Sequence, residues 1–326
     1  MRQTILRWRP IVVGVDGSPE SAGAAVLGWR LAEAAGTTCR LVHAVPDPGT
    51  AFAAMVLHGD VETLEEAVAR LARPRLRAAL EKLLPDPLLD ALTIRLGPVA
   101  RALQNETARL GAGLVILGGK RHPVPERWLA GNSARDAVRT LNVPVLITKG
   151  APSALKRVLL GLDFSYASEP AIREAERFTA LADGQMRAMH VREPVTILPS
   201  PKARSAPQPA NGNTMELLGH EMWRLLRLPD AQRTVRAGNP AAVLAAEAIQ
   251  WDADVLVVGS HRKSWADRLW LGTVTESLLH RLPVSLLAVP GRARPAGEGP
   301  DRHRSRNGGG EQDAGRTSGN TGGPSL

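Results

Sequence analysis

Residues 11–45 read IVVGVDGSPESAGAAVLGWRLAEAAGTTCRLVHAV, and residues 158–191 read VLLGLDFSYASEPAIREAERFTALADGQMRAMHV. Each stretch starts with an apolar run that ends in Asp-x-Ser. A helical pattern follows, and then a second apolar run that ends near a histidine. Asp16 is equivalent to Asp163 and His43 to His190, at a constant offset of 147 positions (163 − 16 and 190 − 43). The chain therefore contains an internal repeat, which predicts two copies of one structural unit.

Glycines mark the second half of each copy. Three pairs of them are related by an offset of 141 positions (238 − 97, 259 − 118 and 272 − 131): Gly97 and Gly238, Gly118 and Gly259, Gly131 and Gly272. Strands and helices alternate at the spacing of βαβ units, and apolar runs such as LVIL and VLVV are typical of parallel strands covered on both faces. The sequence predicts two tandem five-stranded, doubly wound α/β domains, residues 9–150 and 155–290.

Within the first copy the expected elements are specific. Strands are expected at residues 11–15, 40–45, 92–96, 114–117 and 144–148. Helices are expected near residues 21–35, 63–84 (interrupted at Pro74), 99–110 and 133–140, and Ser18 should cap the first helix, with Pro19 at its first position. Two segments do not fit the pattern: residues 192–213, rich in proline, predict a mobile loop, and residues 291–326, rich in glycine, predict a disordered tail.

The bulk composition excludes several protein classes. The chain has 326 residues, a 44% hydrophobic fraction, a net charge of +9 and one cysteine, Cys39. No apolar run is long enough to span a bilayer, and the N-terminal run reads as a strand and not as a signal peptide. No long basic run exists and aromatic residues are few, so nucleic acid is not an expected partner. These features predict a cytoplasmic protein without a disulfide framework. Cys39 is expected to be a small buried hydrophobic residue and not a redox group.

The ordered motifs resemble those of the universal stress protein family. VGVDGS or LGLDFS ends the first strand, VHAV or MHV ends the second, Gly97-Pro98 or Gly238-x-Pro240 opens a helix, and a glycine loop follows the fourth strand. The resemblance implies a Rossmann-like fold similar to the adenine-nucleotide α-hydrolases. It also implies a pseudo-dimer of the two domains through their last strands, VPVLIT and PVSLLAV. A homodimer and an unidentified protein partner remain compatible with it.

The same resemblance implies an ATP site in each copy, because ATP-binding members carry G-x2-G-x9-G-[ST]. In the second copy this motif falls on Gly259, Arg262, Gly272 and Thr273, followed by Val274, and in the first on Gly118, Arg121, Gly131 and Asn132. Contacts to adenine and ribose are implied for Asp163 and Val191, and for Asp16 and Ala44. Arginine replaces the inner glycine twice: it can fill the phosphate position, or it can bind phosphate through its guanidinium. We expect the second copy to bind ATP more readily than the first, where Asn132 replaces the hydroxyl residue. Any Mg²⁺ would arrive with the ATP.

Each candidate also has a structural explanation. An Asp-x-Ser turn can cap a helix without a ligand, so Asp16 and Asp163 are equally compatible with both roles. His43 and His190 have no partner at a catalytic spacing, which favours a structural strand-end role. His122 and His261 lie in the glycine loops and could touch a phosphate, whereas Trp128, Trp265 and Trp270 favour packing over an adenine pocket. No metal-ligand spacing is present.

Three functions follow. The first is a non-enzymatic, nucleotide-responsive stress protein with weak ATPase activity at most. The second is an ATP-pyrophosphatase-type adenylating enzyme, which the sequences DGSPES and DFSYAS disfavour because they lack an SGGxDS-like loop. The third is an interaction module in which both sites are inactive, and the two arginines are its best support. The first is the function that the sequence favours.

Overall fold

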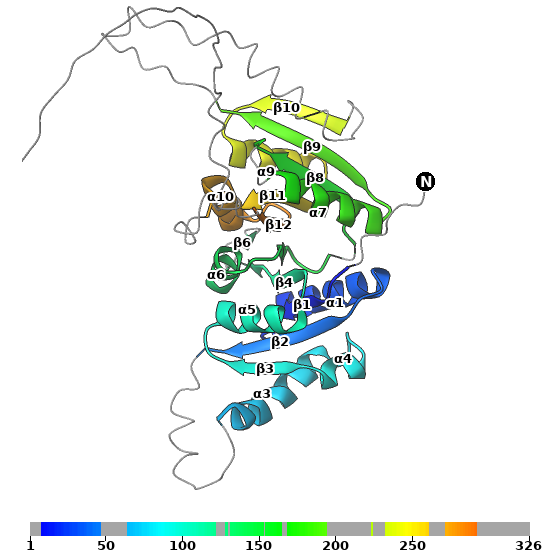
Figure 1. Cartoon of the computed structure of the whole chain (residues 1–326), viewed down its shortest axis with the longest axis vertical. Coiled ribbons are helices and arrows are strands. Elements are labelled where there is room, and N and C mark those ends of the chain that lie inside the picture. The colour runs from blue at the N-terminus through cyan, green and yellow to red at the C-terminus, as the bar shows by residue number, and fades with distance from the viewer. Residues whose placement is uncertain are drawn as a thin grey trace, which may run out of the picture. The chain divides into compact units, whose positions relative to one another are not determined.

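The computed structural model describes residues 8–46, 64–121, 128–129, 131–152, 154–164, 168–193, 223, 232–260 and 271–291 (Figure 1). All of them belong to one compact unit, Met1–Ala293. The predicted loop (residues 192–213) and tail (residues 291–326) lie outside the described residues except for residues 192, 193 and 291, as do most of both glycine loops. Arg192 is the last residue of a strand and not part of a loop. Of Arg121, Trp128 and Leu129 only the backbone is described.

The first repeat contains the strands and helices that its sequence predicts, with boundaries that differ by one or two residues for most of them. Its elements are β1 (Ile11–Gly14), α1 (Pro19–Ala34), β2 (Cys39–Val45), α3 (Leu64–Leu80), α4 (Asp86–Asp90), β3 (Thr93–Leu96), α5 (Val99–Leu110), β4 (Leu114–Gly118), β5 (Lys120–Arg121), β6 (Trp128–Leu129), α6 (Asn132–Thr140) and β7 (Val145–Thr148).

The second repeat keeps the order of the five sheet strands and of three helices, and its described residues contain no counterpart of α3, α4, β5 or β6. Its elements are β8 (Arg157–Leu162), α7 (Ser168–Leu181), β9 (Gln185–Arg192), β10 (Arg233–Ala237), α9 (Pro240–Gln250), β11 (Val255–Ser260), α10 (Thr273–Arg281) and β12 (Ser285–Pro290).

Two features of the α1 and α3 regions test the local predictions. Ser18 caps α1 as expected: its side chain accepts a hydrogen bond from the Ser21 backbone N–H at 3.2 Å, and Pro19 is the first helical residue. The predicted interruption at Pro74 is wrong, because α3 continues through it. Proline removes one backbone donor, but Leu76 and Leu80 beyond it are buried and hold that end of the helix in the core. The short helix α4 was not predicted.

The two halves form one continuous ten-stranded sheet in the order β10-β9-β8-β11-β12-β7-β4-β1-β2-β3. Each half has the same internal order and parallel neighbours, as the repeat predicts. The halves meet where β7 and β12 pair antiparallel, with Leu286 opposite Ile147 and Ala288 opposite Val145. The prediction that the last strands join the two repeats is therefore confirmed.

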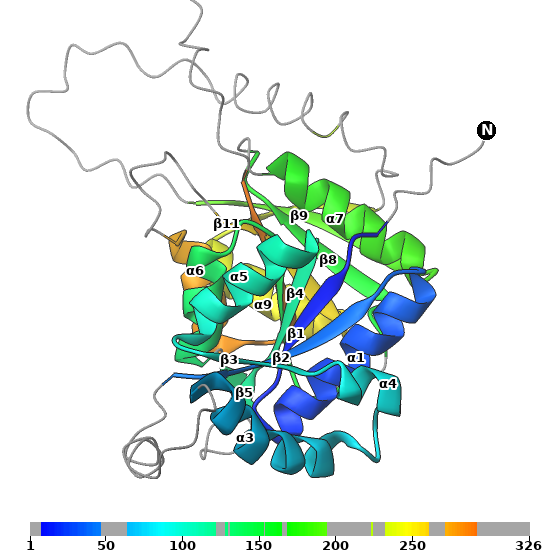
Figure 2. The ribbon, with the colours of Figure 1, turned by 60° about the horizontal axis from the view of Figure 1, so that its bottom comes forward.

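Helices cover both faces of this sheet (Figures 1 and 2). Alternate residues of β1 enter different cores: Ile11 and Val13 face the core under α1, α3, α4 and α7, whereas Val12 faces the core under α5, α6, α9 and α10. Near-continuous burial along the strands follows from this double cover, since both sides of each strand are removed from water. No helix among the described residues is long and apolar enough to cross a membrane.

Side-chain bonds between α6 and α10 form a second contact between the repeats, which we call the α6–α10 seam. Arg139 Nη2 lies 2.8 Å from Glu276 Oε1, and Arg135 Nη1 lies 3.0 Å from His280 Nε2. The offset of 141 makes position 135 equivalent to 276 and position 139 equivalent to 280. The two contacts are thus related by a pseudo-twofold axis, as in an isologous dimer interface.

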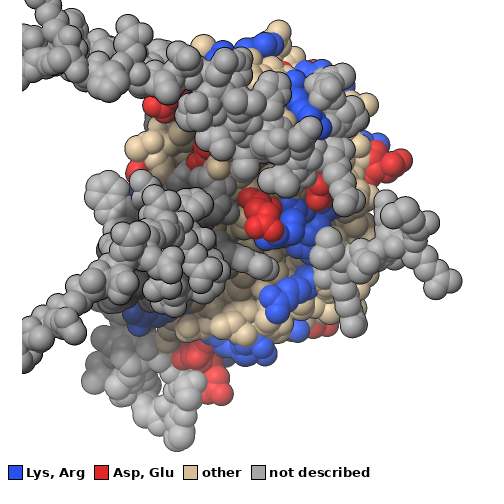
Figure 3. Space-filling model, turned by 45° about the horizontal axis from the view of Figure 1, so that its top comes forward, with Lys and Arg blue, Asp and Glu red and all other residues tan. Residues whose placement is uncertain are grey.

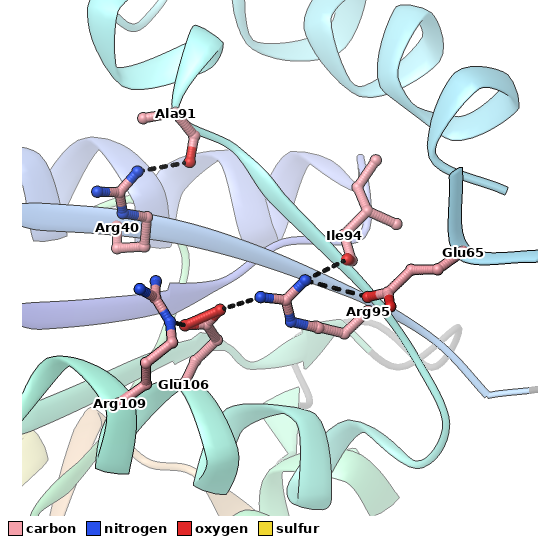
Figure 4. A network of polar contacts seen from close by, with 7 residues as sticks. All are labelled: Arg40, Glu65, Ala91, Ile94, Arg95, Glu106 and Arg109. Carbon is pink, nitrogen blue, oxygen red and sulfur yellow. Dashed lines mark hydrogen bonds and ion pairs between the residues drawn. The ribbon is translucent and has the colours of Figure 1, made fainter. Parts of the chain in front are cut away.

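A buried carboxylate ties helix α5 to the edge strand β3 of the first repeat (Figure 4). Glu106 is almost completely buried and accepts hydrogen bonds from Arg95 of β3 at 2.8 Å and from Arg109 at 2.7 Å. At the equivalent position of the second repeat, Glu247 pairs with Arg187 of β9 at 3.3 Å. The glutamate position recurs, whereas its arginine partner lies on β3 in the first repeat and on β9, the equivalent of β2, in the second. Because a buried charge requires a partner, these pairs have a structural role, away from the cavities described below.

Candidate functional site

Each repeat has a cavity at the carboxyl ends of its central strands, where open α/β sheets bind ligands. The cavity of the second repeat has a volume of about 670 Å³ and that of the first about 360 Å³. The described lining of the larger cavity is Gly161, Leu162, Asp163, Val191, Glu193, Pro240, Leu244, Val258, Gly259, Leu271, Gly272, Thr273, Val274 and Thr275. Both volumes are within the range of small-molecule sites.

The larger cavity joins an acidic end to a helix N-terminus. Asp163 lies just after β8, and its Oδ1 accepts a hydrogen bond from the buried Ser168 hydroxyl at 2.9 Å. Gly272 caps α10, so the first N–H groups of that helix and the exposed Thr273 side chain border the same space. Thr275 Oγ1 lies 3.3 Å from the Gly259 carbonyl and links this helix to the end of β11. Free backbone donors at a helix N-terminus favour an anion, and phosphate is the usual one.

Phe164 supports the acidic end of this cavity. Its φ of 56° is left-handed, and the equivalent first-repeat residue, Gly17, has φ of 81°. Glycine adopts this conformation freely, whereas for phenylalanine it costs about 1–2 kcal/mol. The Phe164 ring packs on the His190 ring, with the two ring centroids 4.5 Å apart, and edge-on against the Trp223 ring, with the centroids 5.3 Å apart. These contacts offset the cost of the left-handed backbone.

In the smaller cavity, the turn after β1 already engages one oxygen of the Asp16 carboxylate. Asp16 Oδ1 accepts hydrogen bonds from the Ser18 N–H at 3.0 Å and the Ser18 hydroxyl at 2.5 Å, and its backbone N–H donates to Ser21 Oγ at 3.2 Å. Partial burial acts to raise the pKa of Asp16, but the bonds from Ser18 and Ser21 and the positive charge of Lys120 together hold this pKa below its usual value. Asp16 therefore stays ionised at neutral pH.

Among the described lining residues of this smaller cavity, Lys120 carries the positive charge. A Cβ built on Gly131 would lie 3.0 Å from Lys120 Cε, 3.1 Å from Cδ and 3.4 Å from Cγ. The aliphatic part of Lys120 therefore lies against Gly131, the residue that caps α6. The backbone of Lys120 is held opposite Leu129 by the β5–β6 pairing, so the base of this side chain is fixed.

Gly118 at the end of β4 sits directly against the start of α1. A Cβ on Gly118 would lie 2.7 Å from the backbone carbon and oxygen of Glu20 and 2.9 Å from Ser21 N. Glycine is needed here for close packing of strand against helix, which is a different role from contacting a ligand.

The two strand-end histidines have equivalent structural contacts. His43 Nδ1 lies 2.7 Å from the Val15 carbonyl, and His190 Nδ1 lies 2.8 Å from the Leu162 carbonyl. Each imidazole donates from Nδ1 and links the ends of two neighbouring strands. These contacts agree with the structural role expected for both histidines.

The structure brings most of the other predicted site residues to the two cavities. Asp163, Val191, Gly259, Gly272, Thr273 and Val274 border the larger one, and Asp16, Ala44, Gly118 and Gly131 border the smaller one. Asn132 instead accepts a hydrogen bond from Arg135 of the α6–α10 seam. Arg262, His122, His261, Trp265 and Trp270 lie outside the described residues, as do the side chains of Arg121 and Trp128.

Sequence reasoning missed several lining residues. In the smaller cavity these include Lys120, Ser18 and Ser133, and in the larger one Leu244 and Glu193. Lys120 had a usable signal, because it directly precedes the motif position of Arg121. The others follow from strand order and helix rotation, which no local motif encodes.

Other candidate chemistries find little support among the described residues. No group of three or more His, Cys, Asp or Glu side chains is arranged to hold a metal ion in this part of the chain. Cys39 is partly buried, and burial raises the pKa of its thiol to about 12, opposed only weakly by Arg40. On the face shown in Figure 3, the described Lys and Arg side chains form separate groups, several of them bordered by Asp and Glu. Such mixed charge is unlike the continuous basic track of a nucleic-acid site.

Comparison with known proteins agrees with this architecture. The model of the universal stress protein family matches residues 7–149 and 154–290. Universal stress protein Rv2005c of Mycobacterium tuberculosis is 26% identical over 291 residues, which cover 84% of this chain and 95% of that protein, and Mb2028c of Mycobacterium bovis gives the same values.

Solved structures show the same fold over most of the chain. A universal stress protein from Archaeoglobus fulgidus matches with a TM-score of 0.60 and 15% identity, covering 89% of this chain and 100% of that one. A protein from Pseudomonas aeruginosa described as a putative universal stress protein matches with a TM-score of 0.57 and 17% identity, covering 88% and 95%. The family model covers both repeats, and the strand order and the cavity position recur in each: this chain belongs to the universal stress protein family, as a member with two tandem domains.

Proposed function

We propose that this protein is a non-enzymatic, nucleotide-responsive stress module whose second domain, residues 155–290, binds ATP in the cavity of about 670 Å³. The observation that carries the proposal is the continuity of that cavity from Asp163 to the N-terminus of α10. A carboxylate suits the hydroxyl and amino donors of a nucleoside, and helix N–H groups suit its phosphates. Val191 and Leu244 add apolar surface between these two ends.

The residues present fit an adenine nucleotide in their chemistry. Asp163 would bind the nucleoside, the α10 N-terminus with Thr273 would hold phosphate, and Mg²⁺ would arrive with the triphosphate. Binding would alter the protein's conformation or its partner affinity only through a difference in affinity between two states. The α6–α10 seam supports such a response, because α10 contacts the first domain through Glu276 and His280.

The first experiment measures whether the full chain carries or binds nucleotide. Purified protein is denatured, and the supernatant is chromatographed for released nucleotide. ATP is then titrated against the melting temperature. At an ATP concentration of 100 times Kd, binding adds about 2.7 kcal/mol to the unfolding free energy, which moves the melting temperature by several degrees. No released nucleotide and no shift at millimolar ATP would favour the alternative, an interaction module with inactive sites.

Two matched variants assign the site. Gly272 has φ −59° and ψ 141°, and Gly131 has φ −63° and ψ 168°, so valine fits the backbone at both positions. Valine at Gly272 adds bulk at the phosphate end of the larger cavity. Valine at Gly131 meets only the flexible Lys120 side chain among the contacts nearest to it. We expect Gly272→Val to abolish the ATP-dependent shift and Gly131→Val to retain it; the reverse would place the site in the first domain.

A further inference from the structure

The two cavities differ in a way that the repeat does not explain. They occupy equivalent positions, yet the first has a volume of about 360 Å³ and the second about 670 Å³. Lys120 borders the smaller cavity together with both ends of the predicted ligand site, Asp16 and Gly131. The equivalent position in the second repeat is His261, which lies outside the described residues.

Lys120 covers the place where phosphate would bind. Its Cγ, Cδ and Cε atoms are the nearest to a Cβ built on the cap residue of α6, so methylene groups occupy the approach to Gly131. A phosphate needs that approach for contact with the first N–H groups of the helix. Methylene groups offer it no hydrogen bond, and they remove space.

Two interactions hold this arrangement. The β5–β6 pairing fixes the Lys120 backbone opposite Leu129, and the Lys120 charge attracts the ionised Asp16 carboxylate. Asp16 is itself engaged by Ser18, so both ends of the cavity are occupied by the chain's own side chains. A triphosphate would have to move Lys120 away from Gly131 and weaken its attraction to Asp16.

We propose that Lys120 sets the ligand selectivity of the first domain: its aliphatic chain blocks the N-terminus of α6 and excludes the phosphate tail of ATP, while a smaller nucleoside monophosphate still fits. This inference rests on the proposed function, since it assumes that the cavities are nucleotide sites. It identifies a selectivity residue that lies beside the glycines of the motif and is not one of them.

The test uses the full chain carrying Gly272→Val, so that only the first domain can bind. ATP and AMP affinities are measured by calorimetry for this background alone, with Lys120→Ala and with Lys120→Met. Alanine removes both the chain and the charge, whereas methionine removes the charge and keeps most of the aliphatic bulk. We expect Lys120→Ala to tighten ATP binding about tenfold while AMP affinity changes little, because an exposed side chain with only a weak attraction to one carboxylate is displaced at modest cost. We expect Lys120→Met to bind ATP as weakly as the background.

The direction in which ATP affinity changes decides between the two roles of Lys120. If Lys120 instead binds phosphate through its ammonium, both substitutions weaken ATP binding, and the proposal is overturned. Unchanged ATP affinity in Lys120→Ala, with a native circular dichroism spectrum, overturns it as well. The chain without substitutions separates the two claims. If the unsubstituted chain binds ATP but Lys120→Ala does not tighten ATP binding in the Gly272→Val background, only the selectivity role is refuted. If Lys120→Ala tightens ATP binding but the unsubstituted chain does not bind ATP, only ATP binding by the second domain is refuted.

Discussion

Replacement of Gly118 by alanine tests whether close packing of β4 against α1 forms the first cavity. The added Cβ would lie 2.7 Å from backbone atoms of Glu20, and backbone at a helix start cannot move aside as a side chain can. Overpacking of this kind costs about 1–3 kcal/mol, and the lower entropy of the unfolded alanine chain returns about 0.4–1 kcal/mol. We therefore expect a net loss of about 1–2 kcal/mol and a melting temperature lower by about 2–6 °C.

Gly111→Ala is the matched control for this experiment. Apart from its chain neighbours and its own helix backbone, no atom lies within 4 Å of a Cβ at Gly111. Its φ of 59° is left-handed, so backbone strain costs alanine about 1–2 kcal/mol, and the same entropy effect returns about 0.4–1 kcal/mol. Chemical denaturation gives the free energy of unfolding of both variants, and equal m-values allow the cost of close packing to be compared with the cost of backbone strain. If Gly118→Ala is no less stable than Gly111→Ala and leaves the first cavity's ligand affinity intact, the close-packing argument fails.

Three further predictions follow from the described contacts. Because burial raises the pKa of Cys39 to about 12, thiol reagents at pH 8 should label it about three orders of magnitude more slowly than in urea-unfolded protein; equal rates would refute this. Folding lowers the pKa of Asp16, so its contribution is present above the unfolded value of about 3.9 and lost below it. Denaturant titrations should therefore show Asp16→Asn less stable than the native chain at pH 7 by under about 1 kcal/mol, with the difference vanishing near pH 2. Glu276→Arg, which opposes Arg139, should be about 1 kcal/mol less stable than Glu276→Gln at low salt, and the gap should shrink in 1 M salt if the seam is electrostatic.

Much of the fold could be predicted because the signals are local and occur twice. The Asp-x-Ser turn, the Ser18 cap and the glycine positions each depend on a few neighbouring residues, and the constant offsets place them in the same order in both copies. The register of β7 against β12 could not be predicted, since antiparallel pairing between two apolar strands leaves few sequence marks. The predicted helix interruption at Pro74 was wrong because tertiary packing of α3 outweighs the loss of one helix hydrogen bond.

The candidate site was predictable in outline and not in its asymmetry. The motif glycines and the two aspartates mark where the cavities lie, because strand ends in a doubly wound sheet converge. The path of Lys120 across Gly131 depends on the β5–β6 pairing and on a side-chain rotamer, neither of which the spacing of the motif encodes. The motif identifies Arg121 and Arg262 as the positions that decide phosphate binding. The structure describes only the backbone of Arg121 and does not describe Arg262.

The α6–α10 seam shows why the two copies differ in their last helices. If two first repeats met through the same pseudo-twofold contact, Arg135 would face Arg139 at both places. The second repeat has Glu276 and His280 at these positions, so the contact contains one Arg–Glu pair and one Arg–His hydrogen bond in place of two Arg–Arg oppositions. Like charges across an interface act against the wrong partner as strongly as matched charges favour the right one. Sequence divergence in α10 thus favours pairing of a first repeat with a second repeat over pairing of two first repeats, while divergence at Lys120 concerns the ligand. The two repeats differ for two separate physical reasons, and each can be tested without changing the other.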